Sequence, residues 1–104
     1  MNENNIACVS RSLATVRMTD SGVVSNTPAY VFDVIGTNSG GDVMEADIRN
    51  GATDASPIAF EVHAVNGSVN HLHFDPPLYM SRGVYVKCTK KVKSIVVRFA
   101  AVRE

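Results

Sequence analysis

The chain has 104 residues, of which 45% are apolar and 19% are charged. This composition is typical of one globular domain and excludes an intrinsically disordered chain. Ten basic and ten acidic side chains cancel, so the chain lacks the net charge that attracts nucleic acid or an anionic membrane. We therefore expect a single domain over residues 1–104 that recognises its partners by the shape of its surface.

The first ten residues, "MNENNIACVS", show no periodicity of apolar residues, and they predict an extended N-terminal arm over residues 1–10. A secretory signal would need basic residues followed by an apolar run, and this segment has an acid and three asparagines instead. No apolar run anywhere approaches the roughly 18 residues of a membrane-spanning helix. The sequence predicts a soluble protein made in the cytoplasm.

Cys8 and Cys88 are the only cysteines of the chain. Two are too few for a disulfide scaffold or for a zinc site of the usual spacing. Because unpaired cysteine behaves as a small apolar residue, we expect free, largely buried thiols. A disulfide between the two is the alternative, although nothing in the spacing calls for it.

Turn-forming residues recur about every eight to twelve positions, which leaves room for short strands and little room for helices. These predicted turns cover residues 19–22, 25–28, 37–42, 50–57, 65–68, 75–77, 81–83 and 89–91.

Two segments between turns alternate with a period of two, as expected for strands with one buried face. The predicted core positions are Met44, Ala46 and Ile48 in residues 43–50, and Ile58, Phe60, Val62 and Ala64 in residues 58–65. A short helix that begins at Asp42 is the alternative for the first segment, since Glu45 stands where a capping box needs it. The flanking glycines leave too few residues for three turns, and the strict alternation favours a strand.

Residues 29–36 ("AYVFDVIG") and 94–102 ("SIVVRFAAV") are apolar on both faces and rich in β-branched and aromatic residues. This pattern is typical of central strands that are covered on both sides or face a partner chain. Residues 11–19 alternate less regularly and predict a further strand. Because about seven or eight short strands cannot bury their apolar faces in one flat sheet, we predict an all-β, antiparallel β-sandwich of jelly-roll or immunoglobulin-like type.

Histidine offers the main candidate for chemistry. His71 and His73 alternate on one predicted strand, so both imidazoles project from the same face, where a metal would need a third ligand. Asp75 on that face is one candidate for it. We interpret the histidines as surface or interface residues, without a metal or another cofactor, and retain His71, His73 and Asp75 as the candidate ligands.

Asn66 and Gly67 form the strongest hairpin signal in the chain. A two-residue turn there would pair Val65 with Ser68. The same register would pair Val62 with His71 and Phe60 with His73, and would place His63 on the opposite side of the sheet. A longer loop would shift the register and bring the three histidines together.

Pro76 and Pro77 lack the N–H group that a strand ladder needs, so they predict that the ladder ends at Asp75. A new strand is expected to begin shortly after them, in the apolar residues that follow.

Other chemistry has little support in the sequence. No serine or cysteine lies in a nucleophile motif, which predicts that the protein is not an enzyme. Residues 37–42 ("TNSGGD") precede no helix that could bind phosphate and predict a flexible hairpin loop. The lysines at positions 87, 90, 91 and 93 have no aromatic residue among them to stack a base, so we interpret them as protection of a sheet edge.

Tyr79 and Tyr85 flank the predicted turn at residues 81–83. Exposed aromatic side chains near a loop are suited to gripping the face of a sugar ring. We favour packing in the core over sugar binding, because Leu78 and Met80 lie beside Tyr79, and because Val84, Val86 and Cys88 share the face opposite Tyr85.

Two segments, "NGATDAS" at 50–56 and "LYMSRGVYV" at 78–86, carry a family resemblance. With the strands around them, residues 29–99 resemble small β-sandwich structural proteins of tailed bacteriophages, of the kind that decorate or cement capsids. The chain departs from that pattern at Pro57, where a glycine is common, and at the lysine-rich residues 87–93, which replace a small neutral hairpin.

The resemblance implies a non-enzymatic virion protein that is made in the host cytoplasm and lies on the capsid surface. It also implies homo-oligomers, often trimers, that bind the major capsid protein. Two alternatives come from other classes. One is a carbohydrate- or receptor-binding module of a tail fibre or cell surface that uses Tyr79 and Tyr85, and the other is a metal-dependent small β-barrel enzyme that uses His63, His71 and His73.

Overall fold

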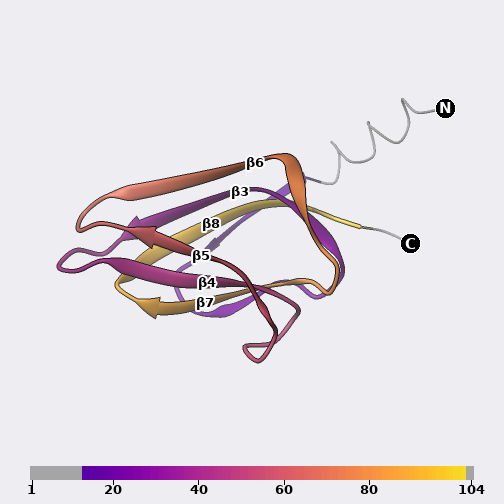
Figure 1. The fold of residues 1–104 in the computed structure, drawn as a ribbon, viewed down its shortest axis with the longest axis horizontal. Helices are drawn as coiled ribbons and strands as arrows, with labels where there is room; N and C mark the ends of the chain where they lie inside the picture. The colour runs from indigo at the N-terminus through magenta and orange to yellow at the C-terminus, as the bar shows by residue number, and fades with distance from the viewer. Residues whose placement is uncertain (1–12, 103–104) are drawn as a thin grey trace.

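The computed structural model describes residues 13–102, which form eight strands in two antiparallel sheets. One sheet has the order β1-β8-β3-β6 and the other the order β2-β7-β4-β5. The predicted all-β sandwich is therefore confirmed, and Figure 1 shows β6, β3 and β8 in one layer and β5, β4 and β7 in the other. The strands are β1 (Leu13–Met18), β2 (Gly22–Ser25), β3 (Ala29–Asn38), β4 (Met44–Asn50), β5 (Ile58–Ala64), β6 (Val69–Met80), β7 (Val84–Lys90) and β8 (Val92–Ala101).

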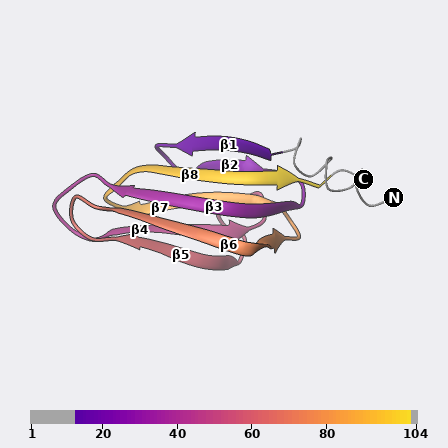
Figure 2. The ribbon, with the colours of Figure 1, turned by 90° about the horizontal axis from the view of Figure 1, so that it is seen from above.

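The strand pairing identifies the sandwich as a jelly roll. Strand β4 pairs with β5, β3 with β6, β2 with β7 and β1 with β8. The chain is thus folded back on itself at the β4–β5 hairpin, and the doubled chain is wound into two sheets, as in a jelly roll. An immunoglobulin-like sandwich distributes its strands differently. Figure 2 looks onto the first sheet, with β1, β8, β3 and β6 in sequence from top to bottom.

The β4–β5 hairpin is the one place in residues 13–102 where consecutive strands share a sheet. Every other connection in this range crosses from one layer to the other. The described residues contain no helix long and apolar enough to cross a membrane.

The core lies between the inner faces of the two sheets, and the alternation of β4 is confirmed. Met44, Ala46 and Ile48 are fully buried, which also confirms the strand over the helix in this segment. In β5, Val62 and Ala64 are buried as predicted, but Ile58 is 47% exposed. The prediction for Ile58 is wrong because the register shifts after Ile48, so that Ile58 lies opposite Arg49.

The two segments that are apolar on both faces form β3 and β8, and both are central strands, as predicted. Residues 13–18 of the less regular segment form β1. Strand β2 was not predicted, because its four residues between two turns are too few to show a period. The predicted arm at residues 1–10 and Cys8 lie outside the described residues.

The turn at Asn66 and Gly67 forms, but the predicted hairpin is wrong. The Ser68 amide donates to the Val65 carbonyl at 3.0 Å, and Gly67 has a φ of 71°. Strands β5 and β6 then enter opposite sheets. Phe60 faces Phe74 across the sandwich, with ring centroids 5.1 Å apart, and does not pair with His73. Crossing between sheets lets both aromatic rings enter one core, which a flat hairpin would not allow.

The loop at residues 37–42 also connects the two sheets, so the prediction of a hairpin there is wrong. The buried side chain of Asn38 holds this connection. Its Nδ2 donates to the Ala64 carbonyl at 2.8 Å and to the Asp42 carbonyl. Gly40 and Gly41 have φ values of 109° and 101°, which only glycine adopts readily.

The predicted end of the ladder at Asp75 is wrong, because β6 continues to Met80 against the same partner. The two prolines do interrupt the pairing: the register passes from Asp33 opposite His73 to Val31 opposite Leu78. Residues 74–77 of β6 therefore bulge opposite Phe32. Both prolines lie in this bulge, where the ladder needs no N–H donor from them, and the pairing resumes at Leu78.

Candidate interaction face

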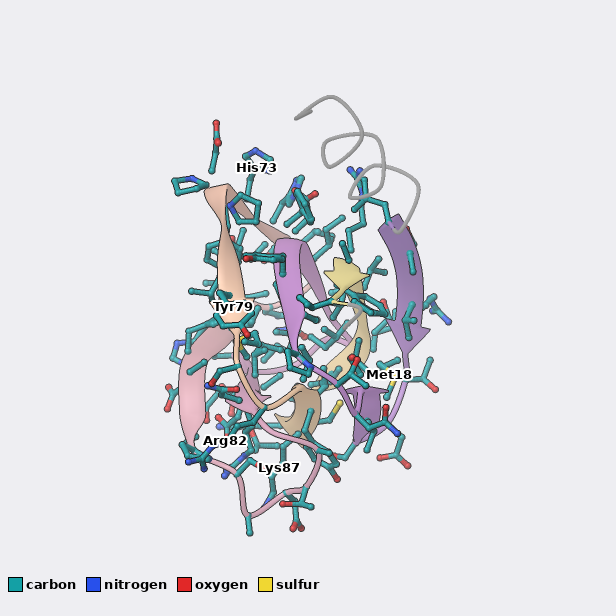
Figure 3. The ribbon with its side chains drawn as sticks, turned by 90° about the vertical axis from the view of Figure 1, so that its right-hand side faces the viewer. Met18, His73, Tyr79, Arg82 and Lys87 are labelled. Atoms are coloured by element: carbon teal, nitrogen blue, oxygen red, sulfur yellow. The ribbon has the colours of Figure 1, made fainter. Side chains whose placement is uncertain are left out.

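The outer side of the β1-β8-β3-β6 sheet carries the candidate site, and we call it the outer face. It combines a tyrosine pair with a cluster of charged and titratable side chains. His73 and Tyr79, both on β6, are labelled in Figure 3. The residues used below are Tyr30, Asp33 and Ile35 of β3, His71, His73 and Tyr79 of β6, and Val96 and Arg98 of β8.

Asp33 is the centre of the charged cluster. The register places it between His73 on β6 and Arg98 on β8. Its Oδ1 lies 2.7 Å from His73 Nδ1 and 2.8 Å from Nε2 of His71, and its Oδ2 lies 3.3 Å from Nη1 of Arg98. The side chain of Asp33 is only 7% exposed, whereas its three partners are about half exposed. A buried carboxylate needs such partners to offset its desolvation.

The proton positions in this cluster follow from the chemistry of the carboxylate. The hydrogen bond from His73 is the main reason that the pKa of Asp33 lies below its usual value, and the bond from His71 comes next. Burial opposes the shift, and the charge of Arg98 adds to it. Because an ionised carboxylate only accepts hydrogen bonds, we assign the facing protons to His71 Nε2 and His73 Nδ1. Among residues 13–102, the other nitrogen of each ring has no hydrogen-bond partner.

The structure brings the predicted pair His71 and His73 together, but Asp33, and not Asp75, is the acid beside them. Asp75 is exposed in the bulged part of β6 and is not among the groups that contact Asp33. Within residues 13–102, no group of three or more His, Cys, Asp and Glu side chains could hold a metal ion. The ring nitrogens point at the carboxylate oxygen itself, and the cation of Arg98 occupies the remaining oxygen.

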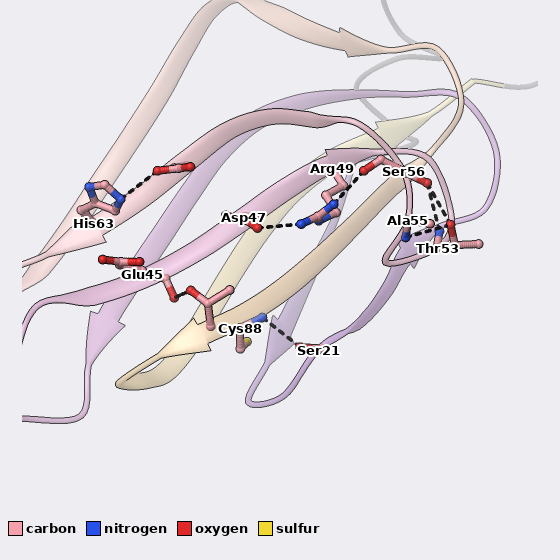
Figure 4. Close-up of polar contacts among 11 residues, drawn as sticks. Ser21, Glu45, Asp47, Arg49, Thr53, Ala55, Ser56, His63 and Cys88 are labelled. Atoms are coloured by element: carbon pink, nitrogen blue, oxygen red, sulfur yellow. Dashed lines mark hydrogen bonds and ion pairs between the residues drawn. The ribbon is translucent and has the colours of Figure 1, made fainter.

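His63 lies apart from the other two histidines. It is on β5, in the other sheet, where its Nε2 lies 3.1 Å from Oε1 of Glu61 (Figure 4). The sequence analysis also placed His63 on the opposite side from His71 and His73, but it did so from a hairpin that does not form. The true cause is that β5 and β6 belong to different sheets.

Asp33 was missed as a site residue in the sequence analysis. One feature of the sequence does mark it: Asp33 is the one charged residue within "AYVFDVIG". A charge in a central strand is seldom tolerated without partners. The two histidines lie 38 and 40 positions away in sequence and Arg98 lies further still, so these partners could not be named before the strand order was known.

The tyrosine pair consists of Tyr30 and Tyr79. Their ring centroids are 5.0 Å apart with planes tilted by 41°, and the residues are 38% and 49% exposed. Tyr85 lies on the other sheet and projects outward, because its neighbours Val84 and Val86 are fully buried. Tyr79 and Tyr85 are therefore on opposite sides of the molecule and cannot contact one sugar ring together, and the core packing that we favoured is wrong for the exposed Tyr79.

The outer side of the β2-β7-β4-β5 sheet carries charged side chains beside two exposed aliphatic ones, Val23 and Ile58, each 47% exposed. Arg49 donates to Oδ2 of Asp47 and to the carbonyl of Ser56, both at 2.9 Å (Figure 4). Lys87 lies opposite Asp47 in the register. At one end of the sandwich, Lys90 pairs with Asp42 at 3.0 Å. Two of the four clustered lysines thus face acids of the same chain.

Cys88 faces the interior from β7 and is half-buried, less than the largely buried thiol that we predicted. Burial raises the pKa of its thiol, with a smaller contribution from the charge of Asp20. A thiol with a raised pKa is a poor nucleophile at neutral pH. Within residues 13–102, Cys88 has no disulfide partner, and its relation to Cys8 stays a prediction.

Comparison with known proteins gives a similarity of structure alone. No family model matches the chain, and no curated protein matches it. A solved structure of the coat protein of tobacco streak virus is similar, with 6% identity and a TM-score of 0.36 over 89% of each chain. A structure of the dimer of that coat protein has 5% identity and a TM-score of 0.37, over 90% of this chain and 88% of that one. At TM-scores this low, the jelly-roll assignment rests on the strand order of this chain and not on the superpositions.

Proposed function

We propose that this protein is a non-enzymatic structural protein of a virus particle, and specifically a capsid decoration or cement protein of a tailed bacteriophage. The observation that carries the proposal is the strand order β1-β8-β3-β6 and β2-β7-β4-β5. Jelly rolls of this kind build viral capsid proteins, and the inference from them is one of fold analogy. The resemblance of residues 29–99 to phage structural proteins supports the same reading.

The outer face supplies the contact surface in this proposal, with the major capsid protein as its partner. Tyrosine is enriched at the centres of protein interfaces because it buries a large area at low entropic cost. Tyr30 and Tyr79 are the two exposed tyrosines of this face. Ile35 and Val96, both half-buried, lie opposite each other on the same face, on the far side of the row formed by His73, Asp33 and Arg98.

The mechanism is stabilisation by binding. A subunit that contacts neighbouring capsid proteins binds the assembled shell and not the dissociated one, so it shifts the equilibrium toward assembly. Self-association of the protein as a homo-oligomer, such as a trimer, would let one bound unit contact several capsid proteins at once.

The test uses particles of the virus whose genome carries this gene. After purification on a density gradient, quantitative mass spectrometry should find the protein at a constant ratio to the major capsid protein. Particles without it should release their DNA at a lower temperature. If the protein is absent from the particles and strictly monomeric in solution, the proposal is wrong.

A carbohydrate-binding module is the second candidate, and the exposed Tyr30–Tyr79 pair is the observation that favours it. Lectin domains also use the jelly roll, and sugars stack on exposed aromatic rings. A glycan array separates the two functions. Binding that disappears in Tyr79→Ala and persists in Tyr85→Ala would support this candidate, and an array without binding would remove it.

A further inference from the structure

The chain contains two Asn-Gly pairs, Asn50–Gly51 and Asn66–Gly67. An asparagine before glycine is chemically labile, because the glycine nitrogen reaches the side-chain carbonyl carbon without hindrance from a Cβ atom. The reaction needs a glycine N–H that is accessible to base and free of a hydrogen bond, and an asparagine side chain that is able to turn toward it. The two pairs differ in both respects.

Asn66–Gly67 meets the first condition, and in the second it is less restrained than Asn50–Gly51. Both residues are exposed at the tip of the turn between β5 and β6. The Gly67 N–H donates to no acceptor within residues 13–102, although the next amide, that of Ser68, bonds to Val65. The Asn66 Oδ1 accepts a hydrogen bond of 2.7 Å from the Gly41 amide. Within the described residues, this is the one hydrogen bond that holds the Asn66 side chain, whereas two hold that of Asn50.

The Asn50–Gly51 pair does not meet these conditions for reaction. Gly51 is buried, and its N–H donates to the Gly83 carbonyl at 3.1 Å. The side chain of Asn50 is held at both ends: its Oδ1 accepts from the Arg82 amide at 2.9 Å, and its Nδ2 donates to Ser81 Oγ at 3.3 Å. Attack on Asn50 would require all three of these bonds to break.

We propose that Asn66 is a site of spontaneous deamidation in the folded protein and that the fold protects Asn50. The Gly67 nitrogen loses its proton to water or hydroxide and forms a bond to the Asn66 side-chain carbon. The bond from this carbon to Nδ2 breaks, and ammonia leaves with the proton. Water then opens the resulting five-membered succinimide at one of its two carbonyl carbons, which yields aspartate or isoaspartate.

The product changes one end of the sandwich. The Asn66 side chain links the β5–β6 turn to the β3–β4 loop through Gly41. An aspartate at this position still accepts the Gly41 hydrogen bond and adds a negative charge. An isoaspartate places an extra methylene group in the backbone, which displaces the side chain from Gly41. Deamidation therefore changes both the charge and the connection of these loops.

The test is peptide mapping by mass spectrometry after incubation of the purified full chain at mildly alkaline pH. The peptide with Asn66 should convert to aspartate and isoaspartate about tenfold or more faster than the peptide with Asn50, since tenfold corresponds to roughly the net free energy of one hydrogen bond. The same incubation in denaturant is the control, because the two pairs should then react at similar rates.

Two further variants separate the chemistry from the fold. Asn66→Gln should abolish conversion at this position, and Asn50→Gln should leave the rate at Asn66 unchanged. The proposal is overturned if Asn50 converts as fast as Asn66 in the folded protein, or if Asn66 remains unchanged when it is folded and converts when it is unfolded.

Discussion

At the scale of single residues, Asp33 has the most unusual environment among the described side chains. It places a nearly buried negative charge in a central strand, and two imidazoles and a guanidinium from neighbouring strands surround it. Its partners are half exposed and lose little when it is removed, whereas Asp33 depends on all three. The carboxylate thus links β6, β3 and β8 on the outer face.

Replacing Asp33 with alanine should lower the free energy of unfolding by about 2 kcal/mol, the range for hydrogen bonds to a charged group. Urea denaturation of the purified variant measures this change. Asp54→Ala is the matched control, because Asp54 is exposed in the β4–β5 loop, and it should change stability by less than about 0.5 kcal/mol. Equal effects of the two variants would contradict the role of Asp33 in linking the strands.

Acid should lower the stability of the fold, because it protonates Asp33. The pKa of Asp33 is lowered in the folded state, chiefly by His73 and then by His71. A carboxylate with a lowered folded pKa contributes stability that is fully present above its unfolded pKa of about 3.9 and is lost as the pH falls through its folded value.

Unfolding free energies measured from neutral pH down to about pH 3 should therefore decline below about pH 4. The decline should be smaller in Asp33→Ala than in the wild type. A curve of the same shape in both proteins would show that Asp33 is not responsible for the acid sensitivity.

At the scale of elements, the connections between sheets depend on a few backbone positions. Gly83, in the turn between β6 and β7, is buried with a φ of 118°. A Cβ atom there would lie 2.5 Å from the carbonyl oxygen of Ser25, which ends β2. Gly83 also accepts the hydrogen bond from Gly51. Three connections thus meet at a position where a side chain does not fit.

Gly83→Ala should therefore destabilise the protein more than Gly67→Ala. Both glycines have positive φ values, but a Cβ atom at Gly67 would meet nothing within 4 Å. Gly67→Ala should cost about 1 to 2 kcal/mol from backbone strain alone, and Gly83→Ala should add the cost of the clash to this amount. Thermal unfolding of the two variants measures the difference, and similar melting temperatures would contradict the close approach at Gly83.

At the scale of the whole molecule, the two outer sides of the sandwich differ in character. The outer face has the exposed tyrosine pair beside the Asp33 cluster, and the other side has the Arg49–Asp47 pair together with the exposed aliphatic residues Val23 and Ile58. Burying aromatic area on binding is favourable, and the outer face has two exposed tyrosines where the other side has the half-buried Tyr85. The outer face of the β1-β8-β3-β6 sheet is therefore the side better suited to contact another protein.

If this face binds the capsid, Tyr79→Ser should weaken binding of the protein to depleted particles by about tenfold or more, as expected for an interface aromatic residue. Tyr85→Ser, on the opposite side, should have little effect. Co-sedimentation of each variant with particles measures the affinity, and circular dichroism checks that both variants fold. Equal binding of the two variants would place the contact elsewhere on the protein.

Local patterns in the sequence were sufficient for most of the strands, β2 being the exception, and for most of the core. Alternation in residues 43–50 placed Met44, Ala46 and Ile48 inside, and apolar residues on both faces marked β3 and β8 as central strands. These predictions succeed because burial of a side chain in a strand depends on its own position in a repeat of two. Turns other than the one predicted at residues 75–77, which lies within β6, were also located correctly, since glycine, proline and asparagine act locally on the backbone.

Which strands lie beside each other was decided by the tertiary structure. Asn66 and Gly67 form the turn that their sequence favours, yet β5 and β6 separate after it, because Phe60 and Phe74 reach one core only from opposite sheets. The charged cluster has the same origin: Asp33 meets His71 and His73 only because β3 lies beside β6. Pairing between distant strands is decided by the packing of all the apolar faces together, and no local pattern records that choice.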